Sequence, residues 1–323
     1  MKAAVFTRYG PPKTIQIGQV EKPTPRDDEV LVKVLAASVN AYDWHMLTGK
    51  PFLVRLTGSG FLKPKGTILG ADVSGRVEAV GKSTTQFHPG DEVYGTVDGG
   101  FAEYVCAPER YLSPKPANLS FEEAAAVPMA GYTALQSLRD RAKLRPGQRV
   151  LINGASGGVG TFAVQVAKAL GGEVTAVCST GNLETARSLG ADHVIDYTKE
   201  DFSRSGQLYD IVYAANGNRS PSAYGRALTP GGTYVISGGT TSQLFQTILL
   251  GRLASGRGKK AGVMMAKRNQ GDLAFLKGLI ESGKVRPVID RRYTLDRTAE
   301  AVGYVCEGHA KGKVVITVAS PAE

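Results

Sequence analysis

A strand–turn–helix pattern that repeats through the second half of the chain limits the possible folds more than any other feature. Between residues 149 and 239, short runs rich in β-branched and aromatic residues alternate with helical patterns. The runs typical of strands are RVLINGAS, EVTAVCS, HVIDY, YDIVYAANG and GGTYVISGG. Such alternation predicts a parallel sheet with helices on both faces. We therefore expect an α/β domain with a doubly wound sheet in this part of the chain.

The turn after the first of these strands consists of small residues, in LINGASGGVG (151–160). A strand, a turn of small residues and a helix form the dinucleotide-binding arrangement, in which the backbone approaches a pyrophosphate and the helix N-terminus supplies N–H groups. The glycine pattern is Ala155-x-Gly157-x-x-Gly160, with alanine where the usual fingerprint has its first glycine. Because at least three further strand–helix units follow, the turn predicts a dinucleotide site.

The end of the second strand bears on which dinucleotide binds. An Asp or Glu about 20 residues beyond the fingerprint would hydrogen-bond the ribose hydroxyl of NAD and repel a phosphate there. The corresponding positions here hold Cys178, Ser179 and Thr180. Because neutral hydroxyls and backbone N–H groups accept a phosphate, we expect NADPH in preference to NADH. No Lys or Arg occupies 181–183, so Tyr197 and a residue from elsewhere would complete this site.

The two ends of the chain have a different character. Residues 1–120 contain strand-like runs divided by Pro and Gly, which predicts a twisted, partly antiparallel β domain. The tail from Val285 returns to strand character, and we expect it to rejoin that domain. Ser120 and Glu123 predict a capping box before an Ala-rich helix, and a helix is expected around 272–282. We expect a mobile loop over 53–66.

Composition excludes several classes of protein. No apolar run reaches the roughly 18 residues that span a bilayer, and the N-terminus lacks a signal-peptide pattern, so we expect a cytoplasmic protein without a membrane span. Three cysteines form no CxxC pair, and four histidines lack metal-ligand spacing. The formal net charge is +10, and residues 252–292 contain eleven Lys and Arg against three Asp and Glu. With little aromatic interleaving, we interpret this segment as a solvated basic face and expect no nucleic-acid partner.

Six motifs occur in a characteristic order, namely GADVSGRVEAVG, HPGDEVYG, AGYTAL, NGASGGVGTFAVQVAKALG, SLGADHVIDY and KGKVVI. Together they resemble the medium-chain dehydrogenase/reductase superfamily, and more narrowly its zinc-independent quinone oxidoreductase branch, the relatives of zeta-crystallin. The resemblance implies a GroES-like β-rich catalytic domain (1–120 and 284–323), an inserted Rossmann domain (121–283) and a nicotinamide in the cleft between them. It also implies a homodimer that pairs along an edge strand in KKAGVMMAK (259–267).

The same resemblance bears on metal binding. A catalytic zinc needs three protein ligands, and alanine and valine cannot supply one. The cysteine-rich lobe of a structural zinc would lie between Tyr94 and Tyr104, where this chain has only GTVDGGFAE. We therefore expect no zinc, because the ligand positions of zinc-dependent members hold Asn40, Ala71–Asp72, and Ala126 or Val127 in this sequence.

The resemblance also assigns roles to residues. Asn40 or Tyr42 would donate a hydrogen bond to a substrate oxygen, and Asp43 would orient a neighbour. The alternatives are a packed aromatic for Tyr42 and a helix N-cap for Asp43. The implied cofactor contacts are Thr133 at the domain junction, Ser156, Gly157, Gly158 and Val159 at the pyrophosphate, Ser179, Thr180 and Tyr197 near the adenosine phosphate, and Asn216, Ser237, Gly238 and Gly239 near the ribose and nicotinamide.

Without a metal, the acceptor must itself delocalise the arriving charge. Quinones and α,β-unsaturated carbonyls do so, and solvent can protonate an enolate. The sequence therefore predicts an NADPH-dependent reductase of quinones or enones. Two alternatives remain open. One is an enoyl or alkenal double-bond reductase of a biosynthetic pathway, gated by the loop at 51–66. The other is a low-turnover NADPH-binding sensor that contacts an anionic partner through 252–292.

Overall fold

The chain forms two compact units. The computed structural model describes residues 1–52, 54–55, 60–64, 67–239, 243, 246–247 and 258–319. Unit 1 comprises Met1–Met129, Arg268–Glu281 and Pro287–Glu323, and unit 2 comprises Ala130–Lys267 and Ser282–Arg286. The division of the domains at 120/121 and 283/284 stays a prediction. The expected loop at 53–66 lies in part outside the described residues. Within the described part of the chain, no helix combines the length and apolar character that crossing a bilayer requires.

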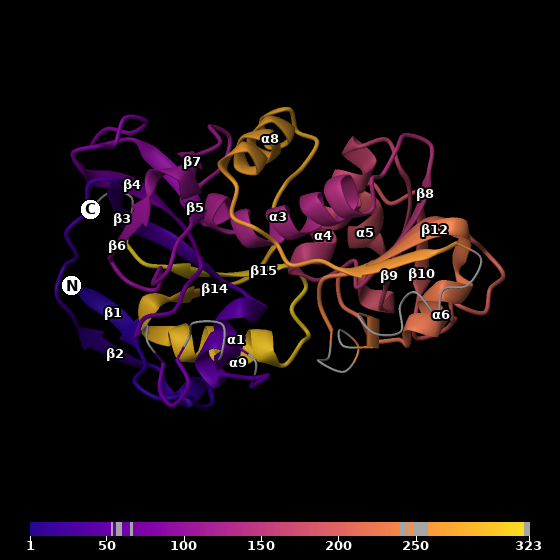
Figure 1. The fold of residues 1–323 in the computed structure, drawn as a ribbon, viewed down its shortest axis with the longest axis horizontal. Helices are drawn as coiled ribbons and strands as arrows, with labels where there is room; N and C mark the ends of the chain where they lie inside the picture. The colour runs from indigo at the N-terminus through magenta and orange to yellow at the C-terminus, as the bar shows by residue number, and fades with distance from the viewer. Residues whose placement is uncertain are drawn as a thin grey trace. The chain divides into compact units, whose positions relative to one another are not determined.

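Unit 1 is organised around a seven-stranded sheet. The sheet order is β14-β15-β3-β4-β5-β7, and β6 also pairs with β3. The C-terminal strand β15 runs antiparallel to β3, which confirms that the tail rejoins the first part of the chain (Figure 1). The strands are β1 (Lys2–Val5), β2 (Gln16–Gln19), β3 (Glu29–Val39), β4 (Asp72–Val80), β5 (Glu92–Thr96), β6 (Tyr104–Pro108), β7 (Leu112–Pro114), β14 (Ile289–Thr294) and β15 (Lys313–Thr317).

The helices of unit 1 cover this sheet and its ends. Buried Val, Leu, Ile, Phe and Ala side chains from β3, β4, β15 and α9 form one core. The helical elements are η1 (Pro12–Thr14), α1 (Ala41–Thr48), η3 (Glu109–Tyr111), α2 (Phe121–Ala125), α8 (Gln270–Glu281), η6 (Leu295–Arg297) and α9 (Thr298–Cys306). The expected capping box is confirmed, because Ser120 Oγ accepts from the Glu123 N–H at 3.2 Å and Glu123 Oε2 accepts from the Ser120 N–H at 2.9 Å.

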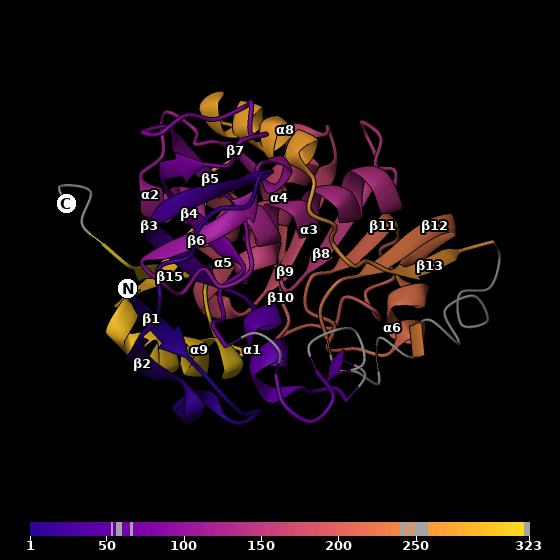
Figure 2. The same cartoon turned by 60° about the vertical axis from the view of Figure 1, so that its left-hand side comes forward.

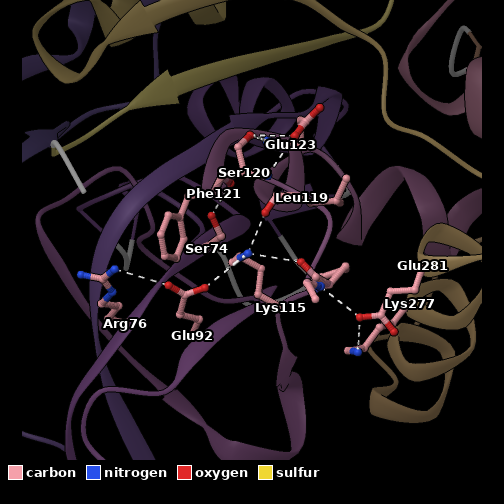
Figure 3. Close-up of polar contacts among 12 residues, drawn as sticks. Ser74, Arg76, Glu92, Lys115, Leu119, Ser120, Phe121, Glu123, Lys277 and Glu281 are labelled. Atoms are coloured by element: carbon pink, nitrogen blue, oxygen red, sulfur yellow. Dashed lines mark hydrogen bonds and ion pairs between the residues drawn. The ribbon is translucent and has the colours of Figure 1, made fainter. Parts of the chain in front are cut away.

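A polar network ties the segment before α2 to the rest of unit 1 (Figure 3). Lys115 Nζ donates to the carbonyl oxygen of Leu119 at 2.6 Å and lies 3.3 Å from Glu92 Oε2. Glu281, at the end of α8, accepts from the N–H of Ala117 at 3.0 Å and from Lys277 Nζ. The ammonium thus gives the Leu119 carbonyl oxygen a partner, and α8 is fixed to the same turn.

Unit 2 holds a six-stranded parallel sheet in the order β10-β9-β8-β11-β12-β13. This order confirms the doubly wound sheet predicted from the strand–helix alternation, and Figure 2 shows β11, β12 and β13 side by side. The elements are α3 (Pro128–Leu135), η4 (Gln136–Arg141, a π-helix), β8 (Arg149–Asn153), α4 (Gly158–Ala169), β9 (Glu173–Cys178), η5 (Thr180–Asn182), α5 (Leu183–Ser188), β10 (His193–Asp196), β11 (Tyr209–Ala214), α6 (Pro221–Arg226), β12 (Leu228–Ile236) and β13 (Lys260–Val263).

Two sequence expectations for these elements have clear outcomes. The Ala-rich helix is not continuous, because α2 ends at Ala125 and a second helix begins at Pro128. Proline has no N–H to donate and is favoured at a helix start, which explains the break. The edge strand in 259–267 is confirmed, since β13 lies at the end of the sheet and pairs with β12. Pairing of two copies along that strand stays a prediction.

Candidate functional site

The predicted cofactor contacts of unit 2 gather, with one exception, where its parallel strands end. The carboxyl ends of parallel strands lie at one edge of a sheet, and ligands bind where the strand order reverses. Here β8 lies between β9 and β11, so the order reverses at β8. Thr133 is the exception, since it is buried on α3. The others are Ser156–Val159 after β8, Ser179 and Thr180 after β9, Tyr197 after β10, Asn216 after β11 and Ser237–Gly239 after β12.

Two glycines shape the turn between β8 and α4. Gly154 has a φ of +81°, in the left-handed region that favours glycine. A Cβ at Gly160 would lie 2.0 Å from the carbonyl oxygen of Gly154, so only glycine fits there. A Cβ at Gly157, by contrast, would meet its nearest atom at 3.7 Å. The tight turn therefore depends on Gly154, one residue before the Ala155 at which the fingerprint places its first glycine.

The loops after β11 and β12 pack closely against this turn. Asn153 Nδ2 donates to the carbonyl oxygen of Asn216 at 2.7 Å and to the hydroxyl of Tyr224 at 2.9 Å. The Gly217 N–H donates to the carbonyl oxygen of Gly238 at 2.6 Å. Asn216 itself is exposed. The backbones of the three loops therefore lie close together at this edge of unit 2, where a ligand's phosphates could approach them.

The residues predicted at the adenosine phosphate lie next to an acid. Thr180 Oγ1 donates to Asp196 Oδ2 at 2.5 Å, and Asp196 Oδ1 accepts from the N–H and the hydroxyl of Thr198. These hydrogen bonds lower the pKa of Asp196, so its carboxylate is ionised at neutral pH. Ser179 Oγ accepts from Asn182 Nδ2 at 2.9 Å, and Tyr197 is 44% exposed. The end of β9 carries no acid, yet the parallel neighbour β10 supplies one.

In unit 1, Asn40 and Asp43 form the start of α1. The helix begins at Ala41, so Asn40 is the N-cap and Asp43 lies at the third helical position; the alternative of Asp43 as N-cap is wrong. Asp43 accepts from the N–H of Asn40 at 2.8 Å and from that of Gly70 at 3.0 Å. Complete burial, reinforced by the charge of Asp72, raises the pKa of Asp43 to about 7. Through these two hydrogen bonds the Asp43 carboxylate links the start of α1 to the backbone at Gly70.

A buried ammonium lies beside this helix start. Lys313 Nζ donates to Asn40 Oδ1 at 2.6 Å and lies 3.7 Å from Asp72 Oδ2. The two N–H groups of the Asn40 amide donate to Asp72 Oδ2 at 3.0 Å and to the carbonyl oxygen of Ser38 at 3.3 Å. Burial raises the pKa of Asp72 and lowers that of Lys313, while each charge opposes the shift in the other. In this arrangement Asn40 has no amide N–H left for a substrate oxygen.

Tyr42 differs from Asn40 and Asp43 in its exposure. Its side chain is 40% exposed, whereas Asp43 is fully buried. Partial burial and the charge of Asp98 raise the pKa of Tyr42, and the guanidinium of Arg268 opposes this effect. Arg268 is in turn paired with Asp98 at 3.0 Å. Tyr42 therefore keeps its proton near neutral pH and is the predicted catalytic residue best able to donate a hydrogen bond.

Comparison with known proteins gives two family matches. Residues 26–117 match the alcohol dehydrogenase GroES-like domain, and residues 189–316 match a family described as zinc-binding dehydrogenase. The 2-methylene-furan-3-one reductase of Solanum lycopersicum is 36% identical over 98% of this chain and 79% of the relative. The chloroplastic NADPH-dependent alkenal/one oxidoreductase of Arabidopsis thaliana is 34% identical over the same shares. The structure of the quinone oxidoreductase from Coxiella burnetii matches with a TM-score of 0.89 at 31% identity, over 99% of each chain.

The chain belongs to the quinone oxidoreductase branch of the medium-chain dehydrogenase/reductase superfamily. This confirms the resemblance, together with the predicted GroES-like and Rossmann architecture. The protein is accordingly an oxidoreductase.

The residues at the ligand positions of this superfamily do not fit zinc. Ala71, Ala126 and Val127 are fully buried and offer no donor atom. Both oxygens of Asp72 already accept hydrogen bonds, Oδ1 from the N–H of Met129 at 3.0 Å and Oδ2 from the Ser38 hydroxyl at 3.2 Å as well as from Asn40. The ammonium of Lys313 also lies in this cluster and would repel a divalent cation. Among the described residues, no cluster of three His, Cys, Asp or Glu side chains suits a metal ion.

Several residues that shape this member of the branch were not predicted from the sequence. Gly154 had a local signal, because Asn-Gly dipeptides mark turns. Lys313 had a weaker one, since a lysine opens an otherwise apolar strand in KGKVVI. Asp196 had none, because its contact with Thr180 depends on the pairing of β9 with β10.

We predict that Gly160→Ala weakens dinucleotide binding by at least about tenfold. The new Cβ would overlap the carbonyl oxygen of Gly154, a backbone atom that cannot move without opening the turn. Titration of reduced nicotinamide dinucleotide, followed by its fluorescence, should show at least a tenfold weaker affinity, on the order of 1.4 kcal/mol. Gly278→Ala serves as control, because its Cβ would meet no atom within 4 Å. Wild-type affinity in Gly160→Ala would contradict the assignment of this turn.

We predict that Lys313→Met destabilises unit 1 by about 3 kcal/mol, because it leaves the Asp72 carboxylate buried without its cation. Trp44, the single tryptophan of the chain, lies on α1 and reports the unfolding of this unit by fluorescence in urea. The double variant Lys313→Met/Asp72→Asn should recover much of the lost free energy of unfolding. Equal stability of the single variant and the wild type would show that the ion pair contributes nothing.

Proposed function

We propose that this oxidoreductase binds NADPH at the carboxyl edge of the unit 2 sheet and reduces quinones or α,β-unsaturated carbonyls without zinc. The observation that carries the proposal is the Gly154–Gly160 turn, where the order of parallel strands reverses and side chains are sterically excluded at Gly160. Two of the relatives support the choice of substrates by their names, an alkenal/one oxidoreductase and a furanone reductase. The first of these is named NADPH-dependent.

The residues at this edge fit a dinucleotide. The turn at 156–159 opens the 12-residue helix α4, whose first N–H groups have no partner within the helix and attract a phosphate. We assign the pyrophosphate to Ser156, Gly157, Gly158 and Val159, the adenosine phosphate to Ser179 and Tyr197, with Thr180 beside them, and the ribose and nicotinamide to Asn216, Ser237, Gly238 and Gly239, with Thr133 as a further contact.

When bound, NADPH supplies the hydride that reduces the acceptor. The chain's part is to hold the acceptor and to stabilise the charge that develops on its oxygen. We assign the hydrogen bond to that oxygen to the Tyr42 hydroxyl. Asn40, Asp43 and Lys313 act as positioning residues, because they fix the start of the helix that carries Tyr42. Solvent completes the reaction by protonating the enolate or hydroquinone oxygen.

The class of acceptor follows from the lack, in the buried cluster of unit 1, of groups free to polarise a substrate carbonyl. The buried cluster of unit 1 uses its cation and its amide internally, so neither polarises a simple ketone. Quinones and enones require less help, since conjugation spreads the charge that the hydride brings. We further propose that the protein is a cytoplasmic homodimer that pairs through β13, and that its domains divide close to residues 120 and 284.

The two alternatives differ in what the chain would have to contact. An enoyl reductase would accept acyl thioesters. A low-turnover sensor would need free cationic side chains in 252–292. In the described part of this segment, Arg268 pairs with Asp98, Lys277 with Glu281 and Lys259 with the carbonyl oxygen of Gly225. Because these cations have partners within the chain, the interpretation of a solvated face is favoured.

A turnover assay tests the proposal. The purified full chain should oxidise NADPH in the presence of a small quinone or enone, followed by the loss of reduced-nicotinamide absorbance. An acyl-thioester panel run in parallel distinguishes the enoyl reductase. Prior treatment with a chelator should leave the rate unchanged, because the ligand set of unit 1 does not fit zinc. Binding of NADPH without turnover on any acceptor would support the sensor instead.

We predict that Ser179→Asp shifts the cofactor preference from NADPH toward NADH. A carboxylate at this position would repel a 2′-phosphate and accept a hydrogen bond from the ribose hydroxyls of NADH. The affinity ratio should change by about tenfold or more, which corresponds to about 1.4 kcal/mol. The dissociation constants of both cofactors are the measurement, and an unchanged ratio would show that the adenosine phosphate lies elsewhere.

A further inference from the structure

The hydroxyl protons near the proposed adenosine phosphate site can be counted. A serine or threonine hydroxyl carries one proton and can donate only one hydrogen bond at a time. A phosphate dianion has only acceptor oxygens, so a hydroxyl binds it by donating. Whether Ser179 and Thr180 can serve the phosphate therefore depends on where their protons already point.

The Thr180 proton is already engaged. Thr180 Oγ1 donates to Asp196 Oδ2 at 2.5 Å, a short contact with a carboxylate that is only 7% exposed. A second threonine, Thr198, donates its hydroxyl and its N–H to the other oxygen of the same carboxylate. Because an ionised carboxylate accepts and never donates, it competes directly with a phosphate for the Thr180 proton.

The Ser179 proton is available. Ser179 Oγ accepts from Asn182 Nδ2 at 2.9 Å, and this bond uses a lone pair of the hydroxyl oxygen. The Asn182 side chain is buried, so it holds Ser179 Oγ in a fixed orientation. The hydroxyl proton can then point outward to a ligand. The two adjacent hydroxyls thus have opposite roles despite their chemical similarity.

The charge of Asp196 also weakens the binding of a phosphate at this site. In the part of the chain that the structure describes, Asp196 pairs with Lys199, whose Nζ lies 3.8 Å away and whose side chain is 70% exposed. Beside Thr180, the carboxylate of Asp196 would lie close to a bound 2′-phosphate and repel it, and it attracts the lysine that could otherwise offset that repulsion. NADH has no phosphate at this position and does not meet this repulsion.

We propose, on the basis of the NADPH site assigned above, that Asp196 restrains the preference of this site for NADPH over NADH, and that Ser179, held by Asn182, is the hydroxyl that donates to the 2′-phosphate. Thr180 instead stabilises the loop after β9 through Asp196. The cofactor preference of the chain is therefore set by a residue on the neighbouring strand as well as by the end of β9.

Four variants of the full chain test this, with NADPH and NADH each titrated by nicotinamide fluorescence. Asp196→Asn keeps the shape of the side chain, removes the charge and frees the Thr180 proton. It should raise the NADPH-to-NADH affinity ratio by about tenfold. Ser179→Ala should lower the ratio by at least about fivefold. Thr180→Val should change it less than about twofold, because the lost proton was not available to the phosphate.

Glu200→Gln is the matched control. It removes one carboxylate four residues after Asp196. The charge of Glu200 acts on Tyr209, the first residue of β11, which lies at the end of that strand away from the proposed cofactor site. It changes the net charge as Asp196→Asn does, and the affinity ratio should stay at the wild-type value. An equal increase in Glu200→Gln would attribute the effect to net charge and overturn the proposal.

The remaining outcomes separate this proposal from the proposed function. An unchanged ratio in Asp196→Asn, or a loss in Thr180→Val as large as that in Ser179→Ala, would overturn the proposal while leaving dinucleotide binding intact. Failure of the wild type to bind either cofactor would instead overturn the proposed function. If Asp196→Asn does not fold, the contrast between Ser179→Ala and Thr180→Val still decides which hydroxyl donates.

Discussion

The buried ammonium of Lys313 connects the C-terminal strand of unit 1 to residues near the start of the chain. Lys313 comes from the C-terminal strand β15, whereas Asn40 is the N-cap of α1 and Asp72 is the first residue of β4. A lysine taken fully out of water is tolerated only with a paired charge and hydrogen-bond acceptors. The antiparallel pairing of β15 with β3 and the local structure of the Asn40 turn therefore depend on each other. Removing any one of the three leaves a buried polar group without its partner.

The two units use different physical means to prepare a site. In unit 1, side chains of opposite charge hold one another in place. Because they are buried, losing one partner leaves the other charge unpaired at a large cost in folding free energy. In unit 2, the absence of side chains matters more, because Gly154 and Gly160 let two backbone segments approach within contact distance. The first arrangement leaves few free donors. The second leaves the first N–H groups of α4 without partners inside the helix, and an anionic ligand there gains from the helix dipole.

Much of the fold could be predicted from the sequence, because the relevant signals are local. The alternation of strands and helices gave the parallel sheet, and Ser120 with Glu123 gave a helix start. The site could be predicted only in part. Lys313 and Asp196 act through contacts between strands, and no local pattern specifies which side chains two strands bring together. The break before Pro128 was missed although its signal is local, since the Ala-rich run on both sides outweighed one proline.

The buried cluster of Asn40, Asp72 and Lys313 also limits which acceptors this protein can reduce, because its polar groups bond to one another. A metal or a free ammonium at this position would lower the barrier for hydride addition to an isolated carbonyl. Here the amide of Asn40 donates to Asp72 and Ser38, and Lys313 donates to Asn40, so the cluster satisfies itself. Of the catalytic candidates, Tyr42 alone combines an exposed side chain with a proton that its raised pKa retains. One neutral hydrogen bond contributes modestly to the stabilisation of an oxyanion. An acceptor whose own conjugation disperses the charge is the kind of substrate that such a site can reduce.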